Sequence, residues 1–156
     1  MKFTFLSLVA LFGFSLTPLV QAEEAAVAAE REAKFQQAMT GVTLTGRWVP
    51  IKDGALGAEK PEKYNIVSVA KTSGENWVIN ARMKYQQQEI VAPIPVQVKW
   101  AGDTAVIIVK DLAVPGGGTY SARVLIHEST YAGTWSGSGY GGLLSGLITK
   151  AAAANP

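Results

Sequence analysis

Two neighbouring segments in the middle of the chain decide the fold. Residues 76–85 read NWVINARMKY and residues 89–100 read EIVAPIPVQVKW. In both segments apolar side chains recur at every second position, from Trp77 to Tyr85 and from Ile90 to Trp100. This period of two is that of a β-strand with one buried face, and a helix does not produce it over such a length. We therefore predict two long β-strands here.

The second of these segments carries two prolines on its more polar face, Pro93 and Pro95. A proline has no backbone N–H and cannot donate a hydrogen bond to a neighbouring strand. We therefore expect this strand to be bent, bulged or at a sheet edge near the two prolines.

Strand-like segments on both sides of these two bring the predicted number of short strands to eight. They lie near residues 44–51, 64–71, 76–85, 89–100, 104–109, 119–127, 130–136 and 143–149. Most connections are short and contain turn-forming residues, as in an all-β sandwich or barrel. We predict an eight-stranded up-and-down antiparallel barrel over residues 41–150. Its one long loop, residues 52–63, is expected to fold over the open end.

The N-terminus has the order of regions found in a secretory signal peptide. A short positive start is followed by an almost wholly apolar run over residues 3–16, then by Pro18 and by small residues at Val20 and Ala22. The run is shorter than the roughly 20 residues that a spanning helix needs. We predict a signal peptide at residues 1–22, a secreted or periplasmic location, and no transmembrane segment after cleavage.

Residues 23–40 are rich in alanine, glutamate and glutamine, which favour helix formation. Phe35 and Met39 share one face of this helix, but that face is otherwise mostly alanine. The pattern predicts a loosely packed helix or a linker, or an arm that docks on a partner. Residues 151–156 are expected to form a flexible tail.

Composition excludes several classes of function. The chain of 156 residues has no cysteine, one histidine and a formal net charge of +2. It therefore has no thiolate metal site or multi-histidine metal centre, and its charge is too small to indicate nucleic-acid binding. His127, Glu128 and Ser129 are adjacent on a strand end and point to alternating faces, so they do not form a catalytic site together. We predict no catalytic residue, no metal, no cofactor and no enzyme activity.

A glycine-rich motif near the C-terminus, residues 137–142, matches the G-x-G-x-x-G pattern of dinucleotide sites. That site needs a following helix and then an acidic residue, and no residue after Gly142 is acidic. We interpret the motif as a hairpin between the last two strands.

Aromatic residues are the candidate ligand contacts. The chain has four tryptophans and five tyrosines, and the alternation directs eight of them inward: Trp48, Tyr64, Trp77, Tyr85, Trp100, Tyr120, Tyr131 and Trp135. They either fill a small barrel or line a cavity in it, and the sequence leaves both open. Arg123, in the middle of a strand, faces outward in one register and enters the lumen in the other. The candidate ligand-binding residues are Trp77, Tyr85, Trp100, Tyr120 and Arg123.

The first strand opens with Leu44-Thr45-Gly46-Arg47-Trp48. This G-x-W pattern resembles the calycin superfamily, which includes lipocalins, fatty-acid-binding proteins and avidins. The resemblance implies that Gly46 and Trp48 are structural positions and that Trp48 plugs the closed end of the barrel. Neither the central Thr-Asp-Tyr type motif of lipocalins nor their late arginine occurs, so no other residue is carried over.

Three further segments, residues 96–104, 118–124 and 131–137, resemble a group of exported bacterial proteins of unknown function, chiefly from planctomycetes. That resemblance implies a lipocalin-like domain. Two functions follow as the main hypotheses. The barrel binds a small, mostly apolar ligand, or a filled barrel acts through its surface as an interaction or inhibitor module on an envelope protein. The volume of the interior separates them. An enzyme with a site built from loops is a third, less favoured alternative.

Overall fold

The computed structural model describes residues 17–85, 88–114 and 117–150, without the side chains of residues 17–19, 83–85 and 88. The predicted tail at residues 151–156 and the first 16 residues of the predicted signal peptide lie outside the described part. One helix is followed by nine strands: α1 (Thr17–Met39), β1 (Val42–Lys52), β2 (Ala55–Leu56), β3 (Lys60–Ser73), β4 (Asn76–Tyr85), β5 (Gln88–Ala101), β6 (Thr104–Val114), β7 (Gly118–His127), β8 (Thr130–Gly137) and β9 (Tyr140–Lys150).

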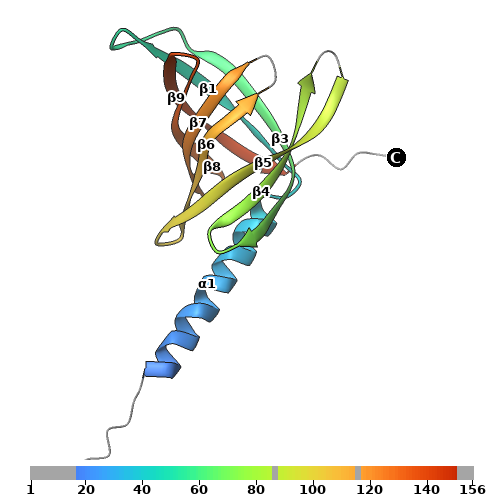
Figure 1. Cartoon of the computed structure of the whole chain (residues 1–156), viewed down its shortest axis with the longest axis vertical. Helices are drawn as coiled ribbons and strands as arrows, with labels where there is room; N and C mark the ends of the chain where they lie inside the picture. Colours follow the sequence, from blue (N-terminus) through green and yellow to red (C-terminus); the bar gives the residue numbers. More distant parts are fainter. Residues whose placement is uncertain (1–16, 86–87, 115–116, 151–156) are drawn as a thin grey trace, which may run out of the picture.

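Eight of the strands form a closed antiparallel barrel (Figure 1). From β3 to β9 each strand pairs with the next one along the chain, and β1 pairs with both β3 and β9. The pairing of β1 with β9 runs from Val42↔Lys150 to Ile51↔Gly141 and closes the barrel. The predicted eight-stranded up-and-down barrel is therefore confirmed.

The prediction of one long loop at residues 52–63 is wrong. Asp53 and Gly54, both with positive φ, make a tight turn, so that Ala55 and Leu56 pair with the end of β1 as β2. β3 then begins at Lys60, earlier than expected. The hairpin extends β1 beyond the barrel instead of folding over its end, and Leu56 is 65% exposed (Figure 1).

The predicted N-terminal helix is confirmed, and it begins at Thr17, within the segment assigned to the signal peptide. Only its C-terminal part packs on the barrel, where Phe35 and Met39 are buried. Val20 and Val27 are exposed on the part that projects away from the barrel (Figure 1). The helix is thus anchored by two large apolar side chains at one end of the barrel, which we call the helix end.

The helix end is packed with aromatic rings. Phe35 makes edge-to-face contacts with Trp77 and Trp100, at centroid distances of 5.4 and 5.6 Å. The guanidinium of Arg31 lies 4.4 Å from the ring centroid of Trp100 and donates a hydrogen bond to the carbonyl of Gly102. These contacts continue the hydrophobic core from the strands into α1.

The pairing between β5 and β6 covers only part of their length. β5 pairs with β4 from Gln88 to Gln97 but with β6 only from Gln97 to Ala101. Ala101 and Thr104 flank a two-residue turn, so they exchange backbone hydrogen bonds. In an antiparallel pair the backbone N–H and C=O groups of every second residue point to the same neighbour, so those of residues 99, 97, 95 and 93 also point towards β6. Pro93 and Pro95 fall on these β6-facing positions and have no N–H to donate. Of the bend, bulge or sheet edge expected at the two prolines, the structure shows an edge.

β6 is irregular on the other side of this gap. Its register with β7 shifts between Val109 and Leu112, and Asp111 has a positive φ of 48°. A bulge of this kind interrupts a ladder and turns the strand. In Figure 1 the β4–β5 hairpin accordingly diverges from the β6–β7 hairpin. We call this separation of the two hairpins the β5–β6 gap.

Candidate ligand cavity

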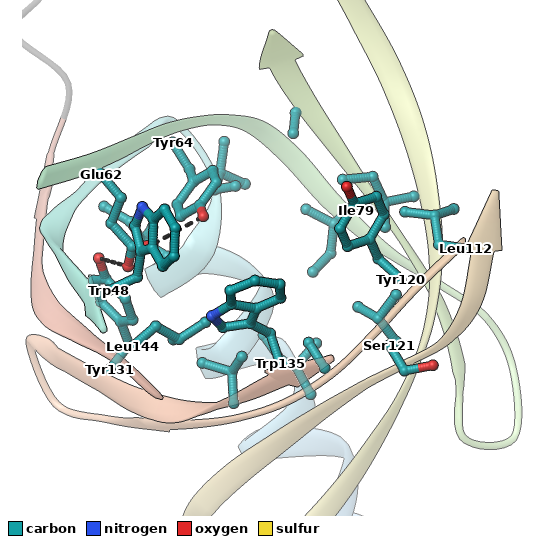
Figure 2. Close-up of a pocket in the computed structure, with 18 of the residues that line it drawn as sticks. Trp48, Glu62, Tyr64, Ile79, Leu112, Tyr120, Ser121, Tyr131, Trp135 and Leu144 are labelled. Carbon is teal, nitrogen blue, oxygen red and sulfur yellow. Dashed lines mark hydrogen bonds between the residues drawn. The ribbon is translucent and has the colours of Figure 1, made fainter. Parts of the chain in front are cut away.

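The barrel interior is filled at the helix end and hollow beyond it. A cavity of about 480 Å³ lies between the strands, with Met39 of α1 among its lining residues. Apart from Glu62 and Ser121, its described lining residues are all aliphatic or aromatic (Figure 2). Both the volume and the lining fall in the range of sites for small molecules. Residues on both sides of the β5–β6 gap, including Ile94 and Leu112, line the cavity.

Four aromatic side chains meet in the cavity wall, near the end of the barrel opposite α1. Trp48 and Trp135 are in edge-to-face contact at 5.4 Å, and Trp135 contacts Tyr140 at 5.2 Å. Tyr120 lies 6.4 Å from Trp135, with its ring tilted. The ammonium of Lys60 lies over the Trp48 ring, 4.8 Å from its centroid. The wall here offers rigid ring surfaces to a ligand.

A carboxylate and two phenols form a polar cluster on the same lining. Tyr64 Oη donates a hydrogen bond to Glu62 Oε2 at 2.9 Å, and Tyr131 Oη donates one to Glu62 Oε1 at 2.8 Å (Figure 2). We call Glu62, Tyr64 and Tyr131 the Glu62 cluster. Burial raises the pKa of both phenols well above their usual range, and the charge of Glu62 and its hydrogen bonds raise these pKa values further.

Two glycines explain how Tyr131 reaches Glu62. The registers place Tyr131 opposite Gly146, Gly146 opposite Gly46, and Gly46 opposite Glu62, in one row across β8, β9, β1 and β3. A Cβ at Gly146 would lie 2.7 Å from Tyr131 Cε1, and a Cβ at Gly46 would overlap Tyr131 Oη. The Tyr131 ring therefore lies across two strands that carry no side chain at those positions.

The two phenols of the Glu62 cluster are committed to its carboxylate. Both phenol protons point to Glu62, and the raised pKa values keep the phenols protonated and unable to act as bases near neutral pH. Each Glu62 oxygen accepts one of these bonds and retains capacity to accept another. Within the described residues, no group of three or more His, Asp or Glu side chains could hold a metal ion.

The five predicted ligand-binding residues do not come together. Tyr120 lines the cavity, whereas Trp77, only 2% exposed, and Trp100 pack against Phe35 at the helix end. Arg123 is exposed, and its strand neighbours Ala122 and Val124 line the cavity, so Arg123 points to the outer face. The side chain of Tyr85 lies outside the described residues.

Trp48 does not plug the closed end of the barrel, contrary to what the calycin resemblance implies. β1 begins at the helix end, and Trp48 lies well along it, in the cavity wall. The helix end is closed instead by Phe35 and Met39, because the last turns of α1 occupy it. Gly46 is a structural position, since it makes room for Tyr131.

Glu62 is the site residue that the sequence analysis missed, because it was assigned to a loop. A signal was present: Glu62 stands two positions before Tyr64, so in a strand the two share a face. Tyr64, Tyr131 and Trp135 were all expected to point inward, and all line the cavity.

Comparison with known proteins does not identify a family for this chain. No protein-family model, curated protein or solved structure matches the chain. In the described part of the chain, no helix combines the length and the apolar character needed to cross a membrane.

Proposed function

We propose that this protein is an exported, lipocalin-like barrel that binds one small, mostly apolar molecule in its cavity. The observation that carries the proposal is the cavity itself, about 480 Å³ with nearly all of its lining apolar. A site of this size and lining encloses a small molecule and removes most of its surface from water. The β5–β6 gap and the end of the barrel opposite α1 are the routes by which a ligand enters.

The alternative of a filled barrel acting through its surface has less support. Large side chains fill the interior at the helix end, where Phe35, Trp77 and Met39 are buried. Beyond them the aromatic rings stand around the cavity and leave its centre free. The proposed role is therefore binding and not inhibition of an envelope protein.

We also propose binding without catalysis. Both phenols of the Glu62 cluster donate to its carboxylate, and the hydroxyl of Ser121 donates to Asp111 Oδ1 at 3.2 Å. The one histidine of the chain, His127, lies at the helix-end turn between β7 and β8. These groups do not form an activated nucleophile with its base.

A titration with a neutral apolar fluorophore, N-phenylnaphthylamine, tests the binding proposal. We expect saturable fluorescence enhancement with one site per chain. Ala122→Phe, which projects a ring into the cavity, should abolish it. Ala132→Phe places the same ring on an exposed position of β8 and should leave binding intact. Equal loss in both variants, or no saturable binding by the folded wild-type protein, would overturn the proposal.

Export is proposed on the signal-peptide pattern of residues 1–22. N-terminal sequencing of the protein recovered from the periplasm or medium of an expressing bacterium tests it. We expect a mature chain that begins at Glu23. Recovery of full-length chain from the cytoplasmic fraction alone would contradict export and leave the binding proposal standing.

A further inference from the structure

We infer that the molecule held in this cavity carries a cationic nitrogen that pairs with Glu62, while its apolar body fills the remaining space. The inference rests on the function proposed above and names the chemical class of its ligand. An alkyl or aryl ammonium fits the site, whereas a fatty acid does not.

The first observation is the charge of the cavity wall. Glu62 is the one carboxylate among the described lining residues, and no lysine, arginine or histidine lines the cavity with it. Its described polar partners are the two phenols, which are neutral. Glu62 is half-buried and faces the cavity without a cation beside it, and a ligand ammonium would supply the opposite charge.

The second observation is that the Glu62 cluster can accept hydrogen bonds from a ligand but has no donor directed at one. Tyr64 and Tyr131 both donate to the carboxylate, so their hydroxyl protons are not directed at a ligand. The unused lone pairs of the carboxylate accept a further donor. A protonated amine has several N–H donors and no acceptor, so it matches this arrangement, whereas a second carboxylate would face Glu62 with like charge.

The third observation is the aromatic surface beside the carboxylate. Gly46 stands opposite Glu62 and Trp48 stands two positions further along β1, so Trp48 and Glu62 are diagonal neighbours on the inner face (Figure 2). Tryptophan rings attract cations through their negative faces. The chain itself uses this property, because the ammonium of Lys60 lies 4.8 Å from the Trp48 centroid.

Lys60 does not satisfy Glu62. It is exposed at the start of β3, and no ion pair within 4.0 Å joins its ammonium to Glu62. The nearby acid that does have a cation is Glu59, which pairs with Arg47 at 2.8 Å on the outer surface. Glu59 and Glu62 therefore give a matched pair of carboxylates, one outside the barrel with a partner and one in the cavity without a cation.

The test compares decylamine, decanol and decanoate, which share one chain length and differ in the head group. Calorimetry at neutral pH should show decylamine binding about tenfold tighter than decanol, equivalent to about 1.4 kcal/mol, and decanoate binding weakest. Glu62→Gln should remove the preference for the amine and leave decanol affinity unchanged. Glu59→Gln removes the same charge outside the cavity and should keep the preference.

The outcomes separate this inference from the binding proposal. If amine and alcohol bind equally well to the wild-type protein, or if Glu62→Gln retains the preference, the cationic ligand is wrong and the cavity remains a binding site. If none of the three probes binds but N-phenylnaphthylamine does, the cationic ligand is wrong and the cavity remains a binding site. If the fluorophore does not bind either, the binding proposal fails as well.

A measurement on the wild-type protein keeps the inference testable if Glu62→Gln does not fold. Nuclear Overhauser contacts should connect the methylene next to the nitrogen of decylamine with the rings of Trp48 and Tyr131. Contacts of that methylene with Met39 instead would place the head group at the helix end and overturn the inference.

Discussion

The helix end and the cavity are built from the same kinds of residue, yet one is packed and the other is hollow. Trp77 at the helix end and Trp48 in the cavity wall both stand on barrel strands and both have an aromatic neighbour in edge-to-face contact. The two regions differ in whether side chains from outside the sheet fill the space between the strands. α1 inserts Phe35 and Met39 into the helix end, and no helix among the described residues does so at the other.

The difference teaches that an inward aromatic residue does not by itself mark a ligand site. The strands alone enclose a space that their own side chains do not fill. Whether a given ring becomes core or cavity wall depends on what covers it from outside the sheet. In this barrel α1 determines that boundary, because Met39 belongs to the buried core and also lines the cavity.

The largest effect is expected at the helix end. Phe35→Ala removes a ring that contacts both Trp77 and Trp100, and it should lower the free energy of unfolding by about 3–5 kcal/mol. Val27→Ala on the projecting part of α1, where Val27 is 59% exposed, should change it by less than about 0.5 kcal/mol. Denaturant unfolding of both variants measures the contrast. Similar small losses would mean that α1 does not close this end.

The next effect concerns the glycines beneath the Glu62 cluster. Gly46→Ala would drive a methyl group into Tyr131 Oη and the Ser145 carbonyl, and should cost about 1–3 kcal/mol of stability. Ser145→Ala changes an exposed position on the strand paired with β1 and is the control. Thermal unfolding measures both. A neutral Gly46→Ala would show that Tyr131 does not lie across this position.

The local pattern of the sequence predicted the strands, the helix and the edge at Pro93 and Pro95, because each depends on neighbouring residues. The division between core and cavity was not predictable in that way. Trp77 and Trp48 have similar strand patterns. Whether each becomes part of the core or of the cavity wall depends on where α1 docks, which is a long-range contact. Glu62 was missed because a charged residue near turn-forming residues resembles a loop until its pairing with Gly46 is known.

The two regions also differ in titratable groups, and the next prediction uses this. The core side chains named at the helix end, Phe35, Met39, Trp77 and Trp100, do not titrate, whereas Tyr64 and Tyr131 beside the cavity have raised pKa values. Unfolded phenols ionise near pH 10, so the unfolded state loses protons that the folded state retains. The free energy of unfolding should therefore be constant below about pH 9 from this source and fall as the pH rises past about 10.

Urea unfolding between pH 8 and pH 11 measures this dependence, and Tyr131→Phe is the matched variant. Without one of the two resistant phenols, its loss of stability above about pH 10 should be shallower than in the wild-type protein. An identical slope in both proteins would show that Tyr131 titrates normally in the fold. The same variant should retain the helix-end contacts, which involve none of these groups.

The last prediction involves no change in stability, because it compares the two ends of one strand in the wild-type protein. β5 runs from the cavity, where β6 does not pair with it, to the helix end, where it does. Amide exchange should be fast at Val91, whose N–H faces the β5–β6 gap, and slow at Gln97 and Lys99, whose N–H groups bond to β6. Ala92 and Ile94 face β4 and should be slow. Val91 is therefore the informative amide, because the next gap-facing positions, Pro93 and Pro95, have no N–H. Uniform protection of that half would mean that β5 and β6 are closed along their length, and the gap would then not serve as a route into the cavity.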